Sequence, residues 1–389
     1  MTIVLAGTSG VTSAASVVGM GDSIGEGVQS ADASWSTQIF TYITWVTFLS
    51  GDNPTVPAVA PNLFGVVGNP DGRPRLAPND LNKNISVSGA DLSDLLYARA
   101  NALTEAQIDS ELDLMLYPRL QSQMEIVEAS PPDILLCWIG NNDVLSAATS
   151  FSALDASQMT SVASFDADYT LLADRLSVLA AGHGTKVALA NIPNVTDIGF
   201  LLDAASAEAL LGFPVSLAPG ERTTLVAVFL MAFAGNDDLL ADANYILDNG
   251  EITAIQTRIS EFNSIIQREA DRIGVPVVDV NTRFQEFVAS PPVIQGRSLT
   301  PGFMQGLFSL DGVHPSITAH GLIAVEFVDV LNDHYGPTVF PMPQSAIDAI
   351  YEMDPNIDKD GDGQAVGRLG AGLMETLAWL VGFTGDTDD

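Results

Sequence analysis

The chain has 389 residues, of which 47% are hydrophobic, and this combination excludes an intrinsically disordered protein. Acidic residues outnumber basic ones 48 to 15, and the resulting net charge of −33 excludes nucleic acid and anionic lipid headgroups as electrostatic partners. The longest apolar run, residues 224–234, is shorter than the about 20 residues of a transmembrane helix, so we expect no membrane span. The acid excess fits either a saline, cation-rich setting or an ordinary acidic secreted protein.

Two further features concern the compartment. Residues 1–16 are small and apolar but contain no Lys or Arg, so they are not a typical signal peptide. Because the first predicted strand follows directly, we expect the mature form of a secreted or periplasmic bacterial protein whose leader has been removed. A single cysteine, Cys137, excludes an intramolecular disulfide, and its apolar surroundings predict a buried, inert thiol.

In chain order, apolar runs that end in turns alternate with helical patterns. The first strand begins at Val17 and ends at a turn around Gly21. The further predicted strands are residues 84–87, 133–139, 186–190 and 274–280; the predicted helices are residues 38–49, 119–129, 169–181, 251–273 and 319–331, with another from residue 92; residues 51–80 form a long irregular loop. This alternation predicts an α/β fold with an open parallel sheet, in which ligands bind beyond the carboxyl ends of the strands.

Residues 196–252 interrupt the alternation and predict an inserted, mainly helical cap. Its apolar residues are either ordinary core or the lining of a site for an apolar substrate. We place a main domain at residues 1–336 and a C-terminal extension at residues 337–389, which holds an acidic run and an apolar helix at residues 373–381.

A nucleophile is predicted at the first turn. Ser23 follows the first strand and opens a helix, so its hydroxyl lies at the carboxyl end of the sheet beside outward-pointing backbone N–H groups. Such a position suits an acyl-transfer nucleophile, although a serine there can also serve only as a helix cap.

A base and its orienting acid are predicted near the end of the main domain. Asp311 and His314 are three residues apart on one turn, which lets the carboxylate hold one imidazole nitrogen while the other faces a distant hydroxyl. The alternative is an ordinary Asp-Gly turn that precedes a surface histidine. The other three histidines, at positions 183, 320 and 334, have no acid placed three residues before them.

Candidate oxyanion donors occur at two other strand ends. Asn142 follows a buried strand and offers a side-chain amide, and Gly89 offers a backbone N–H with no side chain in the way. Together with the backbone N–H of Ser23, they provide three donors for an oxyanion hole.

Four blocks of the sequence together resemble the SGNH, or GDSL-type, hydrolases. They are Gly21-Asp22-Ser23, Gly89, Gly140-Asn141-Asn142-Asp143 and Asp311-Gly312-Val313-His314, and Asn142 rather than Asn141 matches the oxyanion residue. In the second block, Asp91 stands where the family usually has asparagine. The resemblance spans about residues 16–336, and residues 191–196 and 274–281 are also similar to bacterial secreted GDSL lipases and esterases. It implies a flavodoxin-like three-layer α/β/α sandwich and metal-free ester hydrolysis through an acyl-serine.

The acidic run in the extension has the spacing of a calcium loop. Asp358, Asp360 and Asp362 precede Gly363, as at the start of an EF-hand loop, but Leu369 stands where an EF-hand has glutamate. We favour a structural calcium ion over the alternative, a solvated acidic turn.

These observations predict a serine ester hydrolase, an esterase or lipase, with an ester or lipid as its small-molecule substrate and no cofactor for catalysis. One alternative is a carbohydrate acetyl-esterase or an acyltransferase that uses the same site. Another is a calcium-dependent binding module with a vestigial hydrolase site, against which the intact Ser, Gly, Asn, Asp and His residues argue.

Overall fold

The computed structural model of the chain describes residues 16–27, 83–108, 110–150, 152–309 and 311–354, together with Ile357 and Lys359. Four predictions therefore lie outside the described residues: the helix at residues 38–49, the loop at 51–80, the acidic run Asp358, Asp360 and Asp362, and the helix at 373–381.

A parallel sheet forms the centre of the fold. It contains β1 (Val17–Gly21), β2 (Ile134–Trp138), β3 (Lys186–Ala190) and β6 (Val277–Val278), in that spatial order. The predicted strand at residues 84–87 runs along the outer edge of β1, where the N–H of Ile85 donates to the Gly19 carbonyl at 2.8 Å and that of Val87 donates to the Gly21 carbonyl at 3.0 Å. Counted with this segment, the strand order is 2-1-3-4-5, the flavodoxin-like order, and the predicted fold class is confirmed.

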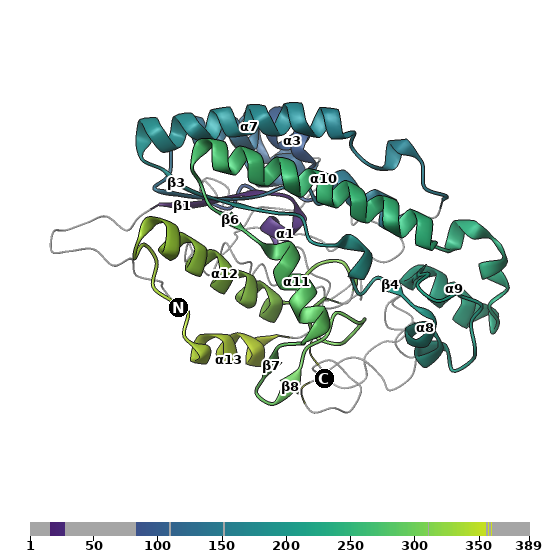
Figure 1. The fold of residues 1–389 in the computed structure, drawn as a ribbon. Helices are drawn as coiled ribbons and strands as arrows, with labels where there is room; N and C mark the ends of the chain where they lie inside the picture. The colour runs from purple at the N-terminus through teal and green to yellow at the C-terminus, as the bar shows by residue number, and fades with distance from the viewer. Residues whose placement is uncertain are drawn as a thin grey trace.

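Helices cover both faces of this sheet, as Figure 1 shows. One face carries α3 (Leu92–Tyr97), α5 (Gln123–Ala129), α7 (Val162–His183) and α10 (Asn249–Ile273), and the other carries α12 (Ile317–Tyr335) with α13 (Gln344–Met353) packed on it. In β2, Leu135 and Cys137 join the core on the α7 side, whereas Leu136 and Trp138 join the core on the α12 side. Burial on both faces explains why this strand is apolar at every position, and it raises the pKa of the Cys137 thiol.

The remaining elements surround the carboxyl ends of the strands. They are α1 (Ser23–Glu26), α4 (Glu111–Leu116), α6 (Asn142–Thr149), β4 (Leu201–Leu202), α8 (Ala204–Leu211), β5 (Thr223–Thr224), α9 (Leu225–Ala234), α11 (Val280–Ala289), β7 (Val293–Ile294) and β8 (Arg297–Ser298). Among the described residues, no helix is both long enough and apolar enough to cross a bilayer.

Capping residues explain where the observed helix ends differ from the predicted ones. Helix α7 begins at Val162, earlier than predicted, because the Ser161 side chain accepts a hydrogen bond from the N–H of Ser164. The predicted strand at residues 274–280 is too long, since Asp279 caps α11 and the chain turns into that helix at Val280.

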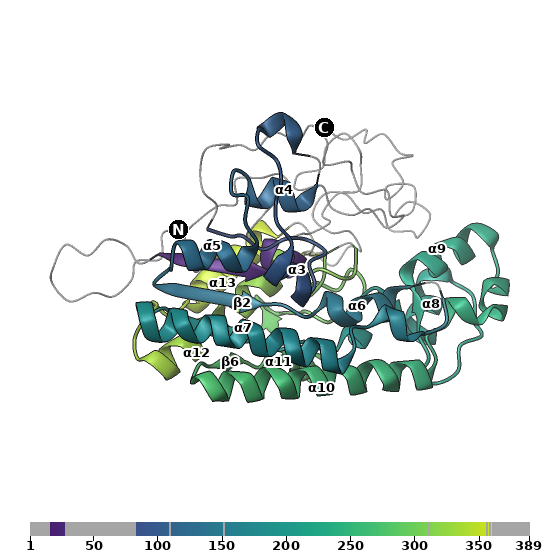
Figure 2. The ribbon, with the colours of Figure 1, turned by 90° about the horizontal axis from the view of Figure 1, so that it is seen from above.

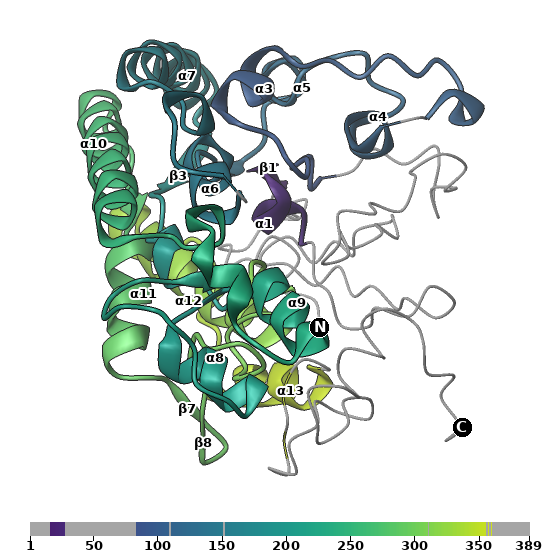
Figure 3. The same ribbon diagram turned by 90° about the vertical axis from the view of Figure 1, so that its right-hand side faces the viewer.

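The predicted cap region contains α8 and α9, which lie at the end of the molecule that faces the viewer in Figure 3. Helix α9 buries Leu225, Val228, Phe229 and Met231 in the main core. These apolar side chains of the cap are therefore ordinary core, which was one of the two interpretations of its sequence.

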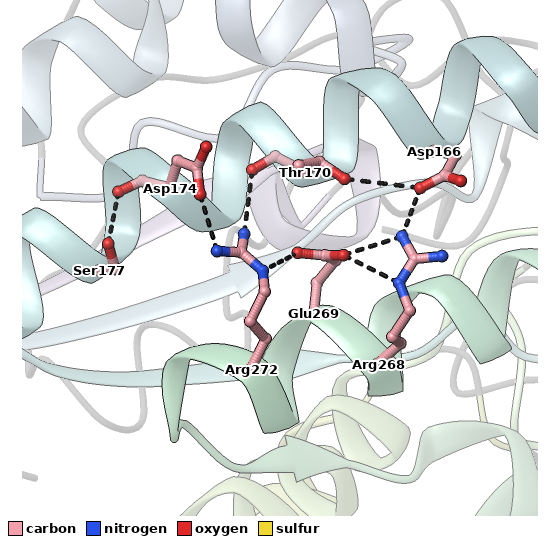
Figure 4. Close-up of polar contacts among 7 residues, drawn as sticks. All are labelled: Asp166, Thr170, Asp174, Ser177, Arg268, Glu269 and Arg272. Carbon is pink, nitrogen blue, oxygen red and sulfur yellow. Dashed lines mark hydrogen bonds and ion pairs between the residues drawn. The ribbon is translucent and has the colours of Figure 1, made fainter.

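An ionic network joins α7 to α10, which lie side by side in Figure 2 and appear in close-up in Figure 4. The Glu269 side chain of α10 is only 4% exposed and receives Arg268 at 2.8 Å and Arg272 at 2.5 Å. Both arginines also reach α7, where Arg268 pairs with Asp166 and Arg272 pairs with Asp174. Two guanidinium groups thus compensate for the burial of one carboxylate and hold the outer helices of this face together.

The described part of the extension packs onto α12. Ile347, Ile350 and Tyr351 of α13 are buried in the main core. The buried Asp354 carboxylate accepts a hydrogen bond of 2.6 Å from the N–H of Thr318, in the first turn of α12. A carboxylate at this position satisfies one of the unpaired N–H groups of the helix and interacts favourably with its dipole.

Candidate active site

The end of β1 places Ser23 at the carboxyl edge of the sheet. Gly21 has φ +155° and lies so close to β2 that a Cβ atom there would be 2.1 Å from the Trp138 carbonyl oxygen. Asp22 then caps α1 by accepting from the N–H of Ile24, and Ser23 is the first residue of that helix. The strand end and the cap together fix the position of the Ser23 hydroxyl.

The structure brings Ser23, His314 and Asp311 together. His314 Nε2 lies 2.9 Å from Ser23 Oγ, and His314 Nδ1 lies 2.7 Å from Asp311 Oδ2. All three residues are buried, with exposed fractions of 6%, 7% and 5% in the order Ser23, His314, Asp311. This chain of hydrogen bonds has the arrangement of a Ser-His-Asp triad.

The turn that carries His314 is organised by Asp311 itself. Its Oδ1 atom accepts from the N–H groups of Val313 at 2.8 Å and His314 at 2.9 Å, which orients its Oδ2 atom toward the imidazole. Gly312, with φ +71°, lies against the Phe200 backbone, where a Cβ atom would be 2.6 Å from the Phe200 nitrogen. The Asp-x-x-His spacing therefore encodes a rigid local unit.

The electrostatics of this unit favour a protonated imidazole beside an ionised acid. Burial by itself raises the pKa of Asp311, but the His314 charge, the ring hydrogen bond and the two backbone donors outweigh burial and lower this pKa. Burial lowers the pKa of His314, but the Asp311 carboxylate, with a smaller effect of Asp22, reverses this and raises the pKa. An acid that stabilises the imidazolium in this way suits a histidine that accepts a proton from a neighbouring hydroxyl.

The two predicted oxyanion residues are tied to each other through Ala90. The Asn142 amide donates to the Ala90 carbonyl at 2.8 Å and carries a second N–H, and Asn142 lines the same cavity as Ser23 and His314. Gly89 precedes Ala90 in an exposed turn with φ +81°, a conformation that favours glycine. Asp91 caps α3 through a capping box with Asp94, so this position has a local structural partner.

Two buried carboxylates beside the site were not predicted as site residues. Asp22 accepts from the Asn141 amide at 2.8 Å, and burial raises its pKa to about 6 against the lowering effect of this bond. Asp143 accepts from the N–H of Leu92 at 3.0 Å, and burial raises its pKa to about 7. Both acids are members of the sequence blocks. Only the structure shows that Asp22 is bonded to the block that contains Asn141, and that Asp143 is bonded to Leu92, close to the block that contains Gly89.

The raised pKa of Asp143 makes stability depend on pH. Because folding favours its protonated form, its contribution to the free energy of unfolding falls as pH rises from about 4 to about 7, by on the order of 4 kcal/mol. We expect Asp143→Asn to melt at a higher temperature than the wild type at pH 8, and at an equal temperature at pH 4. Thermal melts by circular dichroism at both pH values would measure this difference.

Asp155→Asn is a matched control for Asp143→Asn. Hydrogen bonds from Ser157 lower the pKa of the exposed Asp155, so neutralising it should not stabilise the protein at pH 8. If Asp143→Asn melted below the wild type at pH 8, the carboxylate would be stabilised in its charged form and the expectation would be wrong.

A narrow apolar cavity of about 100 Å³ opens beside Ser23 and His314. Its walls come from α11, α12 and the segments around residues 193–198 and 307–315. Phe284 and Phe287 of α11 and Leu322 and Ile323 of α12 all belong to this lining. Of the predicted cap region, residues 196–252, only Ile198 lines this cavity. The cap helices α8 and α9 therefore do not form it, and the second interpretation of the cap, a lining for an apolar substrate, does not describe this cavity.

Apart from Ser23, Asn142 and His314, the residues of this lining were not predicted as site residues. For α11 the signal was present, since Val280, Phe284 and Phe287 recur at helical spacing from the last residue of the fifth predicted strand onward. Residues 274–280 are apolar apart from Asp279, and this composition predicted a strand through Val280.

Of the other three histidines, His320 is the one buried in α12. Burial, with a smaller effect of the His314 charge, lowers its pKa to about 3, so it stays neutral and does not serve as a base near neutral pH. Among the described residues, no group of three or more His, Cys, Asp or Glu side chains is placed to hold a metal ion. The predicted calcium loop lies outside these residues and stays a prediction.

Comparison with known proteins identifies the class of enzyme. The profile of the GDSL-like lipase/acylhydrolase family matches residues 17–327. The chain therefore belongs to this family and is a carboxylic ester hydrolase, which confirms the resemblance seen in its four sequence blocks. A search of curated protein sequences gives no match.

Several solved structures are similar to this chain over most of its length. An α/β hydrolase enzyme from the metagenome of Lake Arreo, Spain, is 15% identical and covers 82% of this chain and 95% of its own, with a TM-score of 0.39. An acetyl xylan esterase variant from Geobacillus stearothermophilus is 15% identical and covers 82% of this chain and 94% of its own, with a TM-score of 0.37. An extracellular lipase from Streptomyces rimosus is 16% identical and covers 82% of this chain and 100% of its own, with a TM-score of 0.35. The family assignment rests on the profile match and not on these likenesses.

Proposed function

We propose that this enzyme hydrolyses acyl esters with Ser23 as nucleophile, His314 as general base and then acid, and Asp311 as the orienting acid. The observation that carries the proposal is the hydrogen-bonded series from Ser23 through His314 to Asp311, with distances of 2.9 and 2.7 Å, of which Ser23 and His314 line an apolar cavity. Family membership supplies the reaction class, and this geometry supports the assignment of roles.

In the proposed first half-reaction, His314 Nε2 takes the proton of Ser23 Oγ as this oxygen attacks the ester carbonyl carbon. The new C–O bond gives a tetrahedral intermediate whose oxyanion is bound by the N–H groups of Ser23 and Gly89 and by the Asn142 amide. As the intermediate collapses, the bond to the alcohol breaks and His314 gives its proton to the departing alcohol. In the second half-reaction, water replaces the alcohol, and the acid and free serine are released.

The lining of the cavity supports a substrate with an acyl chain longer than acetyl. Beside Ser23 it offers Leu307, Phe308 and Val313, which can bury methylene groups but cannot hydrogen-bond a sugar. We therefore favour an esterase or lipase for acyl chains over the alternative carbohydrate acetyl-esterase.

Hydrolysis of a p-nitrophenyl ester series from acetyl to palmitoyl, by the wild type and Ser23→Ala, tests this proposal. We expect serine-dependent activity that is higher for chains longer than acetyl. A maximum at acetyl would support a deacetylase, and transfer of the acyl group to an added alcohol would support an acyltransferase. Absence of activity on every ester, with and without added calcium, would contradict the proposed function and favour the binding-module alternative.

A further inference from the structure

The polar residues that line the cavity fall into two separate groups. Ser23, Asn142 and His314 belong to the proposed catalytic centre and Asn141 holds the adjacent Asp22, whereas Arg283 and Glu326 lie outside this group. The other described residues of the lining are apolar. The side chains of Arg283 and Glu326 are 43% and 28% exposed, so both charges keep part of their hydration.

This second group bridges the two helical walls of the cavity. Arg283 of α11 lies 2.8 Å from Glu326 of α12, measured from Nε to Oε1. Its Nη1 atom lies 2.8 Å from Glu286, and its guanidinium lies 4.9 Å from the centre of the Phe287 ring. The contacts with Glu286 and Phe287 orient the Arg283 side chain along α11, and the contact with Glu326 joins it to α12.

The position of Glu326 along α12 places this bridge away from the catalytic centre. Ala319, Leu322, Ile323 and Glu326 form one stripe of α12 that lines the cavity. Helix α12 starts just after His314, and Glu326 lies seven residues beyond Ala319, which is about 10 Å along the helix axis. An acyl chain that starts at Ser23 and follows the apolar stripe would therefore reach the ion pair last.

We propose that the Arg283–Glu326 ion pair limits the length of the acyl chain that this enzyme accepts. The inference rests on the proposed function and adds a specificity determinant to it. Each methylene buried against the apolar walls should raise kcat/KM about fourfold. A chain that reaches the pair displaces water from two charges without replacing its hydrogen bonds, so the gain ends there.

The double variant Arg283→Leu/Glu326→Leu tests this inference, since it removes both charges and leaves the net charge unchanged. With the p-nitrophenyl ester series, we expect its optimum to move to longer chains. For the ester two methylenes longer than the wild-type optimum, kcat/KM should rise about tenfold or more, mainly through a lower KM. Hydrolysis of the acetyl ester should stay within about twofold of the wild type.

Two further variants serve as controls. Arg175→Leu/Glu128→Leu removes another Arg–Glu pair, joined at 2.6 Å outside the cavity, and should keep the wild-type optimum. Arg283→Lys keeps the opposite charges and should also keep it. If the double variant fails to fold, as judged by circular dichroism, Glu326→Gln should show a smaller shift in the same direction.

The outcomes separate this inference from the function on which it rests. An unchanged optimum with acetyl activity retained would overturn the inference and leave the proposed function intact. An equal loss on all chain lengths would also overturn it, because it would show that the pair has only a structural role. Absence of Ser23-dependent activity in the wild type would instead contradict the proposed function.

Discussion

Ser23→Ala and His314→Ala should each lower kcat for ester hydrolysis by about 10⁴-fold or more, and the double variant should lose no more than either alone. The reason is that the two side chains act as one unit: without His314 the Ser23 hydroxyl keeps its proton, and without Ser23 the base has no nucleophile to activate. Steady-state kinetics on the best ester of the series, with purified folded variants, would measure these losses.

Ser177→Ala and His334→Ala are matched controls, because they remove the same groups from the surface. Ser177 Oγ donates to the Asp174 carbonyl on α7, and His334 contacts the Gly274 carbonyl at 3.2 Å. Both controls should keep wild-type rates. Activity near the wild-type level in Ser23→Ala would place the nucleophile elsewhere, and additive losses in the double variant would contradict a shared mechanism.

Asn142→Ala should lower kcat by about 10²- to 10³-fold with little change in KM. Its amide is proposed to bind the oxyanion, which is present in the tetrahedral intermediate and not in the bound ester. Removing that donor therefore raises the barrier of the chemical step without weakening the binding of the substrate. The measurement is kcat and KM on the same ester as above.

The neighbouring Asn141→Ala variant distinguishes the two asparagines of the block. Asn141 donates to the buried Asp22 carboxylate at 2.8 Å. Asn141→Ala should therefore lower the melting temperature, and it should lower kcat less than Asn142→Ala does. A larger loss of kcat in Asn141→Ala than in Asn142→Ala would mean that the oxyanion donor is assigned to the wrong asparagine.

Local signals in the sequence were sufficient for the central sheet and for the residues at its carboxyl edge. The run from Ile134 to Trp138 predicted a strand covered on both faces because each side chain packs on a helical layer. Asp311 and His314 could be paired because their interaction forms within one turn. The contact of His314 with Ser23 joins residues 291 positions apart, and only the order of strands in the sheet brings it about.

The cavity could not be predicted because its walls come from separate elements. Leu322 and Ile323 lie on the inward face of α12, and helical spacing does not distinguish a residue that packs against another helix from one that borders a cavity. The same holds for Asp143, whose raised pKa depends on its burial behind the turn that carries Leu92. Such properties arise from contacts between distant parts of the chain.

The hydrogen bond from Thr318 to Asp354 has a consequence for engineering of this enzyme. The family profile ends at residue 327, yet the carboxylate that holds the first turn of α12 comes from residue 354. Helix α12 begins three residues after His314, so this hydrogen bond braces the helix that follows the imidazole. A truncation at residue 327 would remove this brace together with the last residues of α12.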